Sequence, residues 1–380
     1  MMIFWSSIEH PRFSALRYVS LSLALVLLGG GASGQETELK TVEKQLETIA
    51  EKLAEYLETS KYGQTVSVGR FGCPPQLGAN AGPGMVKLLH EELERHGIKV
   101  QRVAKFGVEG EYTLLEEHPG TGVPAARITA KLVDRSGTVT TQVERYVEYV
   151  EKVQDIAVLF GATAEVKYEH GEPDPLMVLH ERIVKPRVDV RMTKVAATPE
   201  SAYAVEILIA EGDDYSPRSP ENQDGLAFVP IRRDEIYAIR LINDSGQDAA
   251  VTLSIDGLNM FAFSENRHYR YVIVPAESQG VIKGWHRTNQ VTDAFKVTEF
   301  AGSAVAELGA DDADLGVITV AFSQAWPKDS PPPRELQQML ARRNERLATG
   351  RGPSIEQRFE VVERLVGPLQ TVISIRYTRD

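Results

Sequence analysis

Residues 236–259 read IYAIRLINDSGQDAAVTLSIDGLN, and they indicate how the larger part of the chain folds. Two β-type runs, at 236–242 and 250–256, are separated by the turn sequence Asn-Asp-Ser-Gly at 243–246. The second run ends in Asp-Gly, which is another common turn pair. Short strands separated by turns are typical of an antiparallel sandwich, in which each strand gives one face to the core.

The same pattern continues on both sides of this stretch, so residues 185–380 are predicted to form an antiparallel β-sandwich. Polar residues and two prolines predict a loop at 211–225, and Gly367-Pro368 predicts a turn. A Leu- and Arg-rich stretch after three prolines predicts a helical insertion at 334–348. The other predicted strands are 202–210, 269–274, 281–282, 294–297, 316–322, 357–365 and 371–377.

Residues 36–168 are predicted to form a mixed α/β sheet domain. Apolar residues at helical spacing predict a first helix, a β-type run follows at 65–71, and a second helix ends at Gly97. Two alternating runs, 126–133 and 138–147, predict a β-hairpin. The apolar stripe of the first helix consists of Val42, Leu46, Ile49, Leu53 and Leu57.

These two domains make the predicted fold class α+β, with a linker at 169–184 between them. The linker begins where HGEPDP, residues 170–175, interrupts the periodicity. Residues 176–184 are compatible with either a strand or a helical turn.

The first 34 residues are predicted to be a secretory signal peptide. Arg12 and Arg17 precede an apolar run at 18–28, and small residues follow at 29–34. Ala32 and Gly34 suit a signal peptidase, which places cleavage before Gln35. An uncleaved amino-terminal anchor is the alternative, although the run is shorter than the roughly 20 residues of a spanning helix.

The charge of the chain bears on its partners. The net charge is −11, and it becomes slightly more negative once the leader is removed. Nucleic acid is therefore excluded as a partner, because phosphate binding needs a basic surface. The mature chain is expected to have no integral membrane span, and a periplasmic or extracellular location follows from the leader.

The predicted first domain resembles a known envelope domain. The resemblance rests on VSVGRF at 66–71, the helix that ends at Gly97, VEGEY at 108–112, and the strand at 126–133. This domain is shared by curli-secretion lipoproteins, the amino-terminal domain of TolB, and flagellar or peptidoglycan-synthase accessory lipoproteins. The resemblance implies partner binding or assembly. This chain departs from many members because it lacks the lipid-attachment Cys.

The predicted second domain resembles a widespread β-sandwich domain of uncharacterised exported bacterial proteins. The match includes VTLSIDGLN at 251–259, IKGW at 282–285 and VISIRY at 372–377. The DGLN pattern with the later Gly-Trp pair is its most specific part. The resemblance implies a fold and export, and it implies no activity.

Asp256, Asn259 and Trp285 form the candidate binding loop, since loops on rigid sandwiches carry binding sites. The alternative is structural. Asp-Gly at a strand end commonly forms a turn, Asn259 then caps that turn, and Trp285 is a core or rim aromatic.

Other motifs lead to no predicted catalytic, cofactor or metal residue. The Gly- and Pro-rich loop at 78–84 lacks a phosphate-binding motif, and His90 and His96 are six residues apart, so they diverge on a helix. Cys73, the only cysteine, has no local base and is expected to be a packed residue, although intermolecular pairing is an alternative. An acidic group lacks the EF-hand spacing for calcium, and it consists of Asp311, Asp312 and Asp314.

Three classes of function remain. The preferred one is an exported envelope protein that acts by protein binding or assembly without catalysis, with an envelope protein or polymer as partner. The first alternative is a structural surface protein that self-associates, which would be a homo-oligomer. The second is a secreted hydrolase of an envelope polymer, although the sequence has no GxSxG elbow and no HExxH helix.

We expect the exported form of the protein to begin at Gln35, because the small residues before it fit a signal peptidase. Amino-terminal sequencing of protein recovered from periplasmic and extracellular fractions measures this. Recovery of the intact product among cytosolic proteins would contradict the prediction of export.

Overall fold

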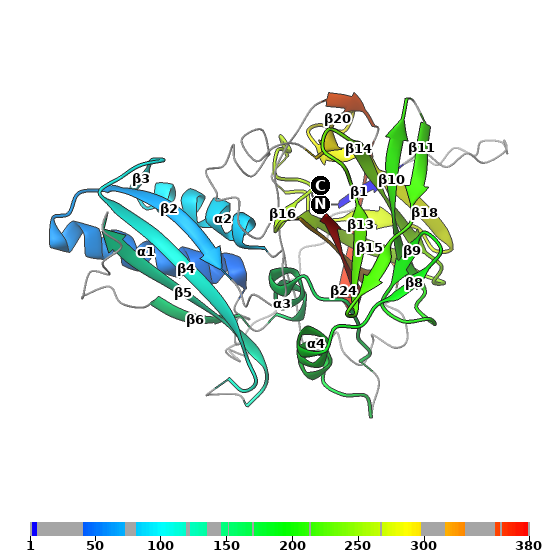
Figure 1. Cartoon of the computed structure of the whole chain (residues 1–380), viewed down its shortest axis with the longest axis horizontal. Coiled ribbons are helices and arrows are strands. Elements are labelled where there is room, and N and C mark those ends of the chain that lie inside the picture. Colours follow the sequence, from blue (N-terminus) through cyan, green and yellow to red (C-terminus); the bar gives the residue numbers. More distant parts are fainter. Residues whose placement is uncertain are drawn as a thin grey trace.

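A computed structural model of the chain forms two modules with an α+β fold (Figure 1). The predicted helical insertion at 334–348 lies outside the residues that the structure describes. The described residues are 2–5, 41–72, 81–118, 122–134, 146–150, 152–168, 171–212, 214–266, 268–297, 316–330, 354–357 and 359–378.

The first module is a five-stranded mixed sheet with α1 and α2 on one face (Figure 1), as predicted. β2 pairs in parallel with β3 and β4, whereas β4 with β5 and β5 with β6 are antiparallel. The elements are α1 (Val42–Ser60), β2 (Thr65–Gly72), α2 (Gly82–Arg95), β3 (Lys99–Val100), β4 (Phe106–Leu115), β5 (Ala125–Asp134) and β6 (Tyr146–Val150).

Helix α1 forms where the sequence predicts it. The Thr41 side chain accepts a hydrogen bond from the Lys44 N–H at the start, and Lys61 ends the helix in the left-handed conformation. The predicted stripe faces the sheet, and four of its residues are completely buried. These four are Leu46, Ile49, Leu53 and Leu57.

The second module consists mainly of two sheets. The first follows the order β12-β13-β24-β21-β15-β17-β1-β23, with β16 beside β15 and β7 beside β24. Its strands are β1 (Met2–Trp5), β7 (Ala164–Glu165), β12 (Glu221–Gln223), β13 (Leu226–Pro230), β15 (Asp248–Ile255), β16 (Leu258–Asn259), β17 (Val272–Val274), β21 (Val317–Pro327), β23 (Phe359–Val362) and β24 (Arg364–Thr378).

The second sheet follows the order β19-β20-β14-β10-β9-β8, with β11, β18 and β22 paired to β10, β14 and β20. All of its pairs are antiparallel. Its strands are β8 (Asp189–Arg191), β9 (Lys194–Ala196), β10 (Tyr203–Glu211), β11 (Asp214–Arg218), β14 (Ile236–Asn243), β18 (Ser278–Ile282), β19 (Gly284–His286), β20 (Val291–Lys296) and β22 (Ser354–Glu356).

The segment 236–259 supplies a strand to each of these sheets. β14 belongs to the second sheet and β15 to the first, so the turn at 243–246 carries the chain from one sheet to the other. The amide of Asn243 fixes this corner by donating to the carbonyl oxygens of Gln247, Val274 and Pro275 at 2.8–3.0 Å. The β-sandwich is therefore confirmed, although β13–β24 and β1–β17 are parallel pairs that the sequence did not predict.

Two other expectations are wrong. The predicted loop at 211–225 contains β11 and β12, whose polar residues and prolines are compatible with peripheral strands. The predicted turn Gly367-Pro368 lies inside β24, where register shifts against β21 accommodate the two residues without ending the strand.

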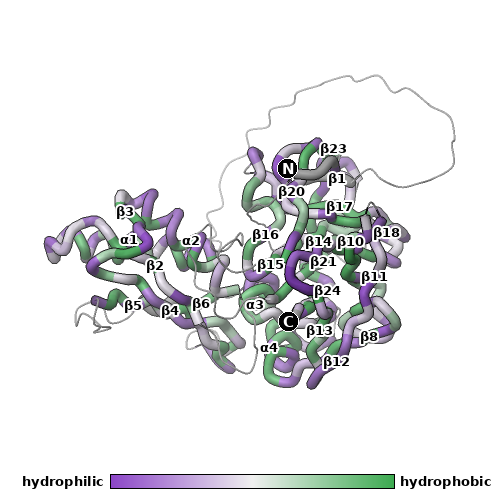
Figure 2. The backbone as a smooth tube through the Cα atoms, turned by 45° about the horizontal axis from the view of Figure 1, so that its top comes forward, coloured by the Kyte–Doolittle hydropathy of each residue, from purple (hydrophilic) through white to green (hydrophobic). Residues whose placement is uncertain are grey.

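Residues 153–184 pack against the second module. Helix α3 (Val153–Phe160) is followed by β7, and the predicted linker contains helix α4 (Pro175–Val184). The Arg376 guanidinium donates to the Gly161 carbonyl at 3.0 Å, and the Ser374 hydroxyl donates to the Ala162 carbonyl at 2.9 Å. Figure 2 shows α3 largely in the green of hydrophobic residues, as expected for a helix between two packed layers.

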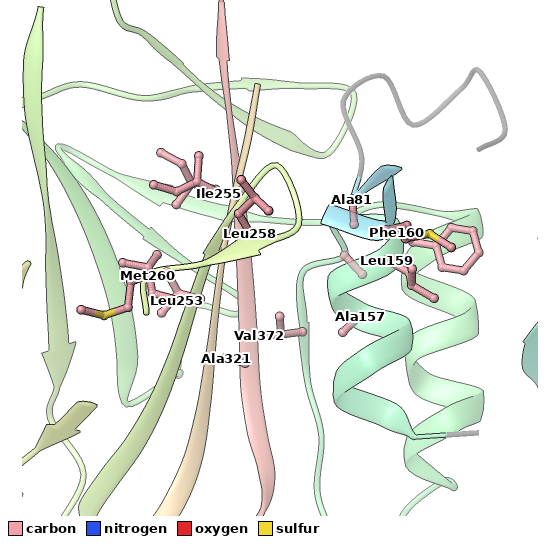
Figure 3. Packing of buried hydrophobic residues seen from close by; sticks show 14 of the residues in the cluster. Ala81, Ala157, Leu159, Phe160, Leu253, Ile255, Leu258, Met260, Ala321 and Val372 are labelled. Atoms are coloured by element: carbon pink, nitrogen blue, oxygen red, sulfur yellow. The ribbon is translucent and has the colours of Figure 1, made fainter. Parts of the chain in front are cut away.

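The two modules meet at a tight backbone contact. The N–H of Gly84, in the first turn of α2, donates to the Asp256 carbonyl at 3.1 Å. A Cβ atom at Gly84 would collide with the Gly257 carbonyl, and one at Gly257 would lie 2.6 Å from the Ala81 oxygen. Figure 3 shows Ala81 between α3 residues Leu159 and Phe160 and the β15–β16 turn. The buried core is continuous across this junction.

We expect Gly84→Ala to destabilise the protein by about 1–3 kcal/mol, because the added methyl group overpacks a rigid backbone contact. In a solvent-exposed helix the same substitution stabilises by about 1 kcal/mol, so the sign of the change in stability shows whether the contact is present. Urea unfolding measures the difference. Gly246→Ala is the matched control, since nothing lies within 4 Å of the position that its added methyl group would take, and a change within about 0.5 kcal/mol is expected there. Equal stabilities of both variants would contradict the contact.

Candidate functional site

A groove of about 780 Å³ lies between the modules, and we call it the interdomain groove. One wall comes from α1 and α2, and the other from the segment 261–270 of the second module. The groove is lined by Thr41, Glu43, Lys44, Glu47, Lys87, Leu88, Glu91, Glu92, Arg95, Phe261, Ala262, Phe263, Ser264, Glu265, Tyr269 and Arg270.

Helical periodicity explains the charged wall. The apolar residues of α1 and α2 face the sheet, so their charged residues lie on the other side and reach the groove. Lys44 and Glu47 form an ion pair of 2.9 Å between Nζ and Oε2. Two more ion pairs, Lys87 with Glu91 and Arg95 with Glu92, lie on α2 at spacings of four and three residues.

Glu43 is the most perturbed carboxyl group of the groove. Burial raises its pKa from 4.5 to about 7. Arg270 and Lys152 oppose this shift, while the nearby carboxylates of Asp155 and Glu92 reinforce it. Near neutral pH, a bound cation would favour the ionised form of Glu43 and release its proton.

The aromatic wall rests on a buried histidine. His286 is fully buried and its ring contacts those of Phe261 and Tyr269, with centroids 5.3 and 5.4 Å apart. Its Nδ1 lies 3.0 Å from the Ser264 hydroxyl and its Nε2 lies 3.3 Å from the Asn289 side-chain oxygen. Through Ser264 and the rings of Phe261 and Tyr269, His286 holds the segment 261–270 in place.

Asp256, the first residue of the predicted binding loop, lies in the β15–β16 hairpin. Asp256 and Gly257 both have positive φ, as a tight type I′ turn requires. The Asp256 carboxylate accepts from the N–H groups of Gly316 and Val317 at 2.5 and 2.9 Å, and from the Tyr377 hydroxyl at 2.9 Å. It thereby ties the turn to the start of β21 and to β24.

Asn259 and Trp285 are also buried. The Asn259 side-chain oxygen accepts from the Phe261 N–H at 3.4 Å, just after the same hairpin. Trp285 lies on β19 and packs edge-on against Phe263 and Phe295, with ring centroids 5.9 and 5.2 Å away. The structure places Asp256 and Asn259 in one hairpin and Trp285 in an aromatic cluster. Their binding role stays a prediction.

The other sequence features have local roles or lie outside the described residues. Gly84, at the end of the Gly- and Pro-rich loop, directs its N–H to a protein carbonyl. His90 lies 3.3 Å from Glu94, whereas His96 is the C-cap of α2 and is exposed. The residues of interest that lie outside the described ranges are Cys73, Asp311, Asp312 and Asp314.

Searches with protein-family models, among curated proteins and among solved structures each found no match to this chain. The two family resemblances therefore remain predictions. Within the described ranges, no helix is long and apolar enough to cross a bilayer, and no group of three or more His, Cys, Asp or Glu residues could hold a metal ion.

The groove is not predictable from the sequence, because nothing in the sequence places the segment 261–270 opposite the charged face of α2. The one local signal is the run EELER at 91–95, which has an excess of charge on a helix.

We expect Glu43→Gln to be more stable than the wild type above pH 7, by up to about 3 kcal/mol, and similar to it below pH 4.5. The raised pKa means that the folded state holds an extra proton between pH 4.5 and 7, so wild-type stability falls as pH rises through this window. Urea unfolding at pH 4 and pH 8 measures the difference. The control is Glu51→Gln on the exposed side of α1, and an equal pH effect in both variants would contradict the assignment.

Proposed function

We propose that this protein is exported to the cell envelope and binds a partner protein or polymer there through the interdomain groove. The observation that carries the proposal is the construction of the groove. Both modules contribute to it, and its charged side chains lie beside aromatic rings. Such a mixture of ionic and aromatic groups favours recognition of an extended polar partner over enclosure of a small apolar ligand.

The ion pairs of the groove support binding. Arg95 is paired with Glu92 but remains well exposed, and Lys44 and Glu47 are both about half exposed. Exposed pairs stabilise the fold by at most about 1 kcal/mol, so a partner can replace them at little cost. Charges arranged in this way set orientation and specificity.

Export is supported by the amino-terminal sequence. Arg12 and Arg17, the apolar run and the small residues before Gln35 have the order of a secretory leader. Periplasmic and extracellular locations are both consistent with that leader.

We expect charge reversal in the groove to reduce partner capture about tenfold or more, because like charges then face the ligand. The double variant Arg95→Glu with Glu265→Lys changes one exposed charge on each wall. Purified mature protein is immobilised, and material captured from envelope extract is quantified by mass spectrometry and by sugar analysis.

The matched control is Lys131→Glu, which reverses an exposed charge outside the groove lining and is expected to leave capture unchanged. Equal capture by both variants would contradict the site. Sedimentation that shows concentration-dependent oligomers would favour the self-associating surface protein, and turnover of a cell-wall polymer would favour the hydrolase.

A further inference from the structure

A short segment from the start of the chain occupies a place inside the sheet of the second module. β1 lies between β17 and β23, as Figure 2 also shows. It runs parallel to β17, with Ile3 level with Val272, and antiparallel to β23, with Trp5 level with Phe359. Among the strands that the structure describes, these four residues alone join β17 to β23.

The inference rests on the export part of the proposed function. Cleavage before Gln35 removes β1, so the mature chain keeps β17 and β23 without the strand that joins them. Each then presents unpaired backbone N–H and C=O groups toward the same gap, which we call the strand slot. Two facing edges with open hydrogen-bonding groups form a site for an added strand.

The register defines the chemistry of the occupant. A position level with Val272 or Phe359 lies on the face of the main hydrophobic core, to which both residues belong. A position level with Ile273 or Val362 lies on the opposite face, where these two residues belong to a second apolar cluster. On the β23 side, Glu360 and Val361 are exposed, whereas every residue of β17 is buried. Side chains alternate between the two faces of a strand, so an occupant must be apolar where it lies beside β17.

The sequence of β1 fits this requirement, because MIFW has no polar residue in four positions. We propose that, in the mature protein, the strand slot binds an extended apolar segment of about four residues from an envelope partner. The segment runs parallel to β17 and antiparallel to β23, in the register that β1 has in the full chain.

We take the partner to be a different protein, because a mature copy has lost Met2–Trp5, the segment that fills the slot in the full chain. None of the strands of the slot contributes a residue to the groove lining, although the Phe359 ring lies 5.0 Å from the His286 ring behind the groove wall. The two sites therefore use different residues, and separate ligands test them.

The experiment uses the mature chain from Gln35 and a fluorescently labelled peptide of residues 1–6, MMIFWS. We expect saturable one-to-one binding of the peptide, which fluorescence anisotropy measures. The full chain, with its own β1 in place, should bind at least about tenfold more weakly. Hydrogen exchange should show new protection at 272–274 and 359–362 in the mature chain when the peptide is added.

The control peptide, MMDFWS, places a charge on the core face and should bind at least about tenfold more weakly than MMIFWS. The full chain with Ile3→Asp serves as a second acceptor if the mature chain does not fold, since its own β1 is weakened, and it should bind MMIFWS.

Absence of binding by both acceptors would overturn the inference, as would equal binding of the two peptides. The inference would also be overturned if the unaltered full chain bound MMIFWS as tightly as the mature chain does, or if the mature chain formed dimers without peptide. Retention of groove-dependent capture in that case would leave the proposed function intact.

Discussion

The turn at Asp256 and Gly257 is the constraint on which the arrangement of the two modules depends. Both residues have positive φ. Because Gly257 has no side chain, the backbone at the amino-terminal end of α2 can lie directly against the turn. The Asp256 carboxylate holds the beginning of β21 and the Tyr377 hydroxyl of β24, while its carbonyl receives the Gly84 N–H. One residue thereby links three strands of the sandwich to a helix of the other module.

The groove follows from that junction. The segment 261–270 leaves β16 directly after the turn, so its position relative to α2 is set by the same contact. The buried ring of His286 then fixes this segment through its contact with the Ser264 hydroxyl. Since the groove has one wall from each module, its shape depends on the junction. A change in how the modules meet would therefore change the affinity of the groove for a partner.

The apolar stripe and the alternating runs each act within one module, so they predict the fold of a module better than a site between modules. The sequence marks Asp256-Gly257 as a turn and Asp256 as a candidate binding residue. The hydrogen bonds of Asp256 to Gly316, Val317 and Tyr377 follow only from the tertiary structure. Glu43 gave no signal, because its perturbed pKa comes from burial and from residues distant in the sequence, Arg270 and Asp155.

The sequence by itself determined the local structure and the class of the fold. The stripe on α1, the alternating strands and the turn residues at 243–246 and 256–257 act over a few residues, so periodicity and backbone preference suffice to predict them. Only the tertiary structure decided which strands pair, that β24 runs through Gly367-Pro368, and that charged helix faces border a groove. These features depend on contacts between residues that are far apart in the chain. Local sequence patterns do not predict the free energy of such contacts.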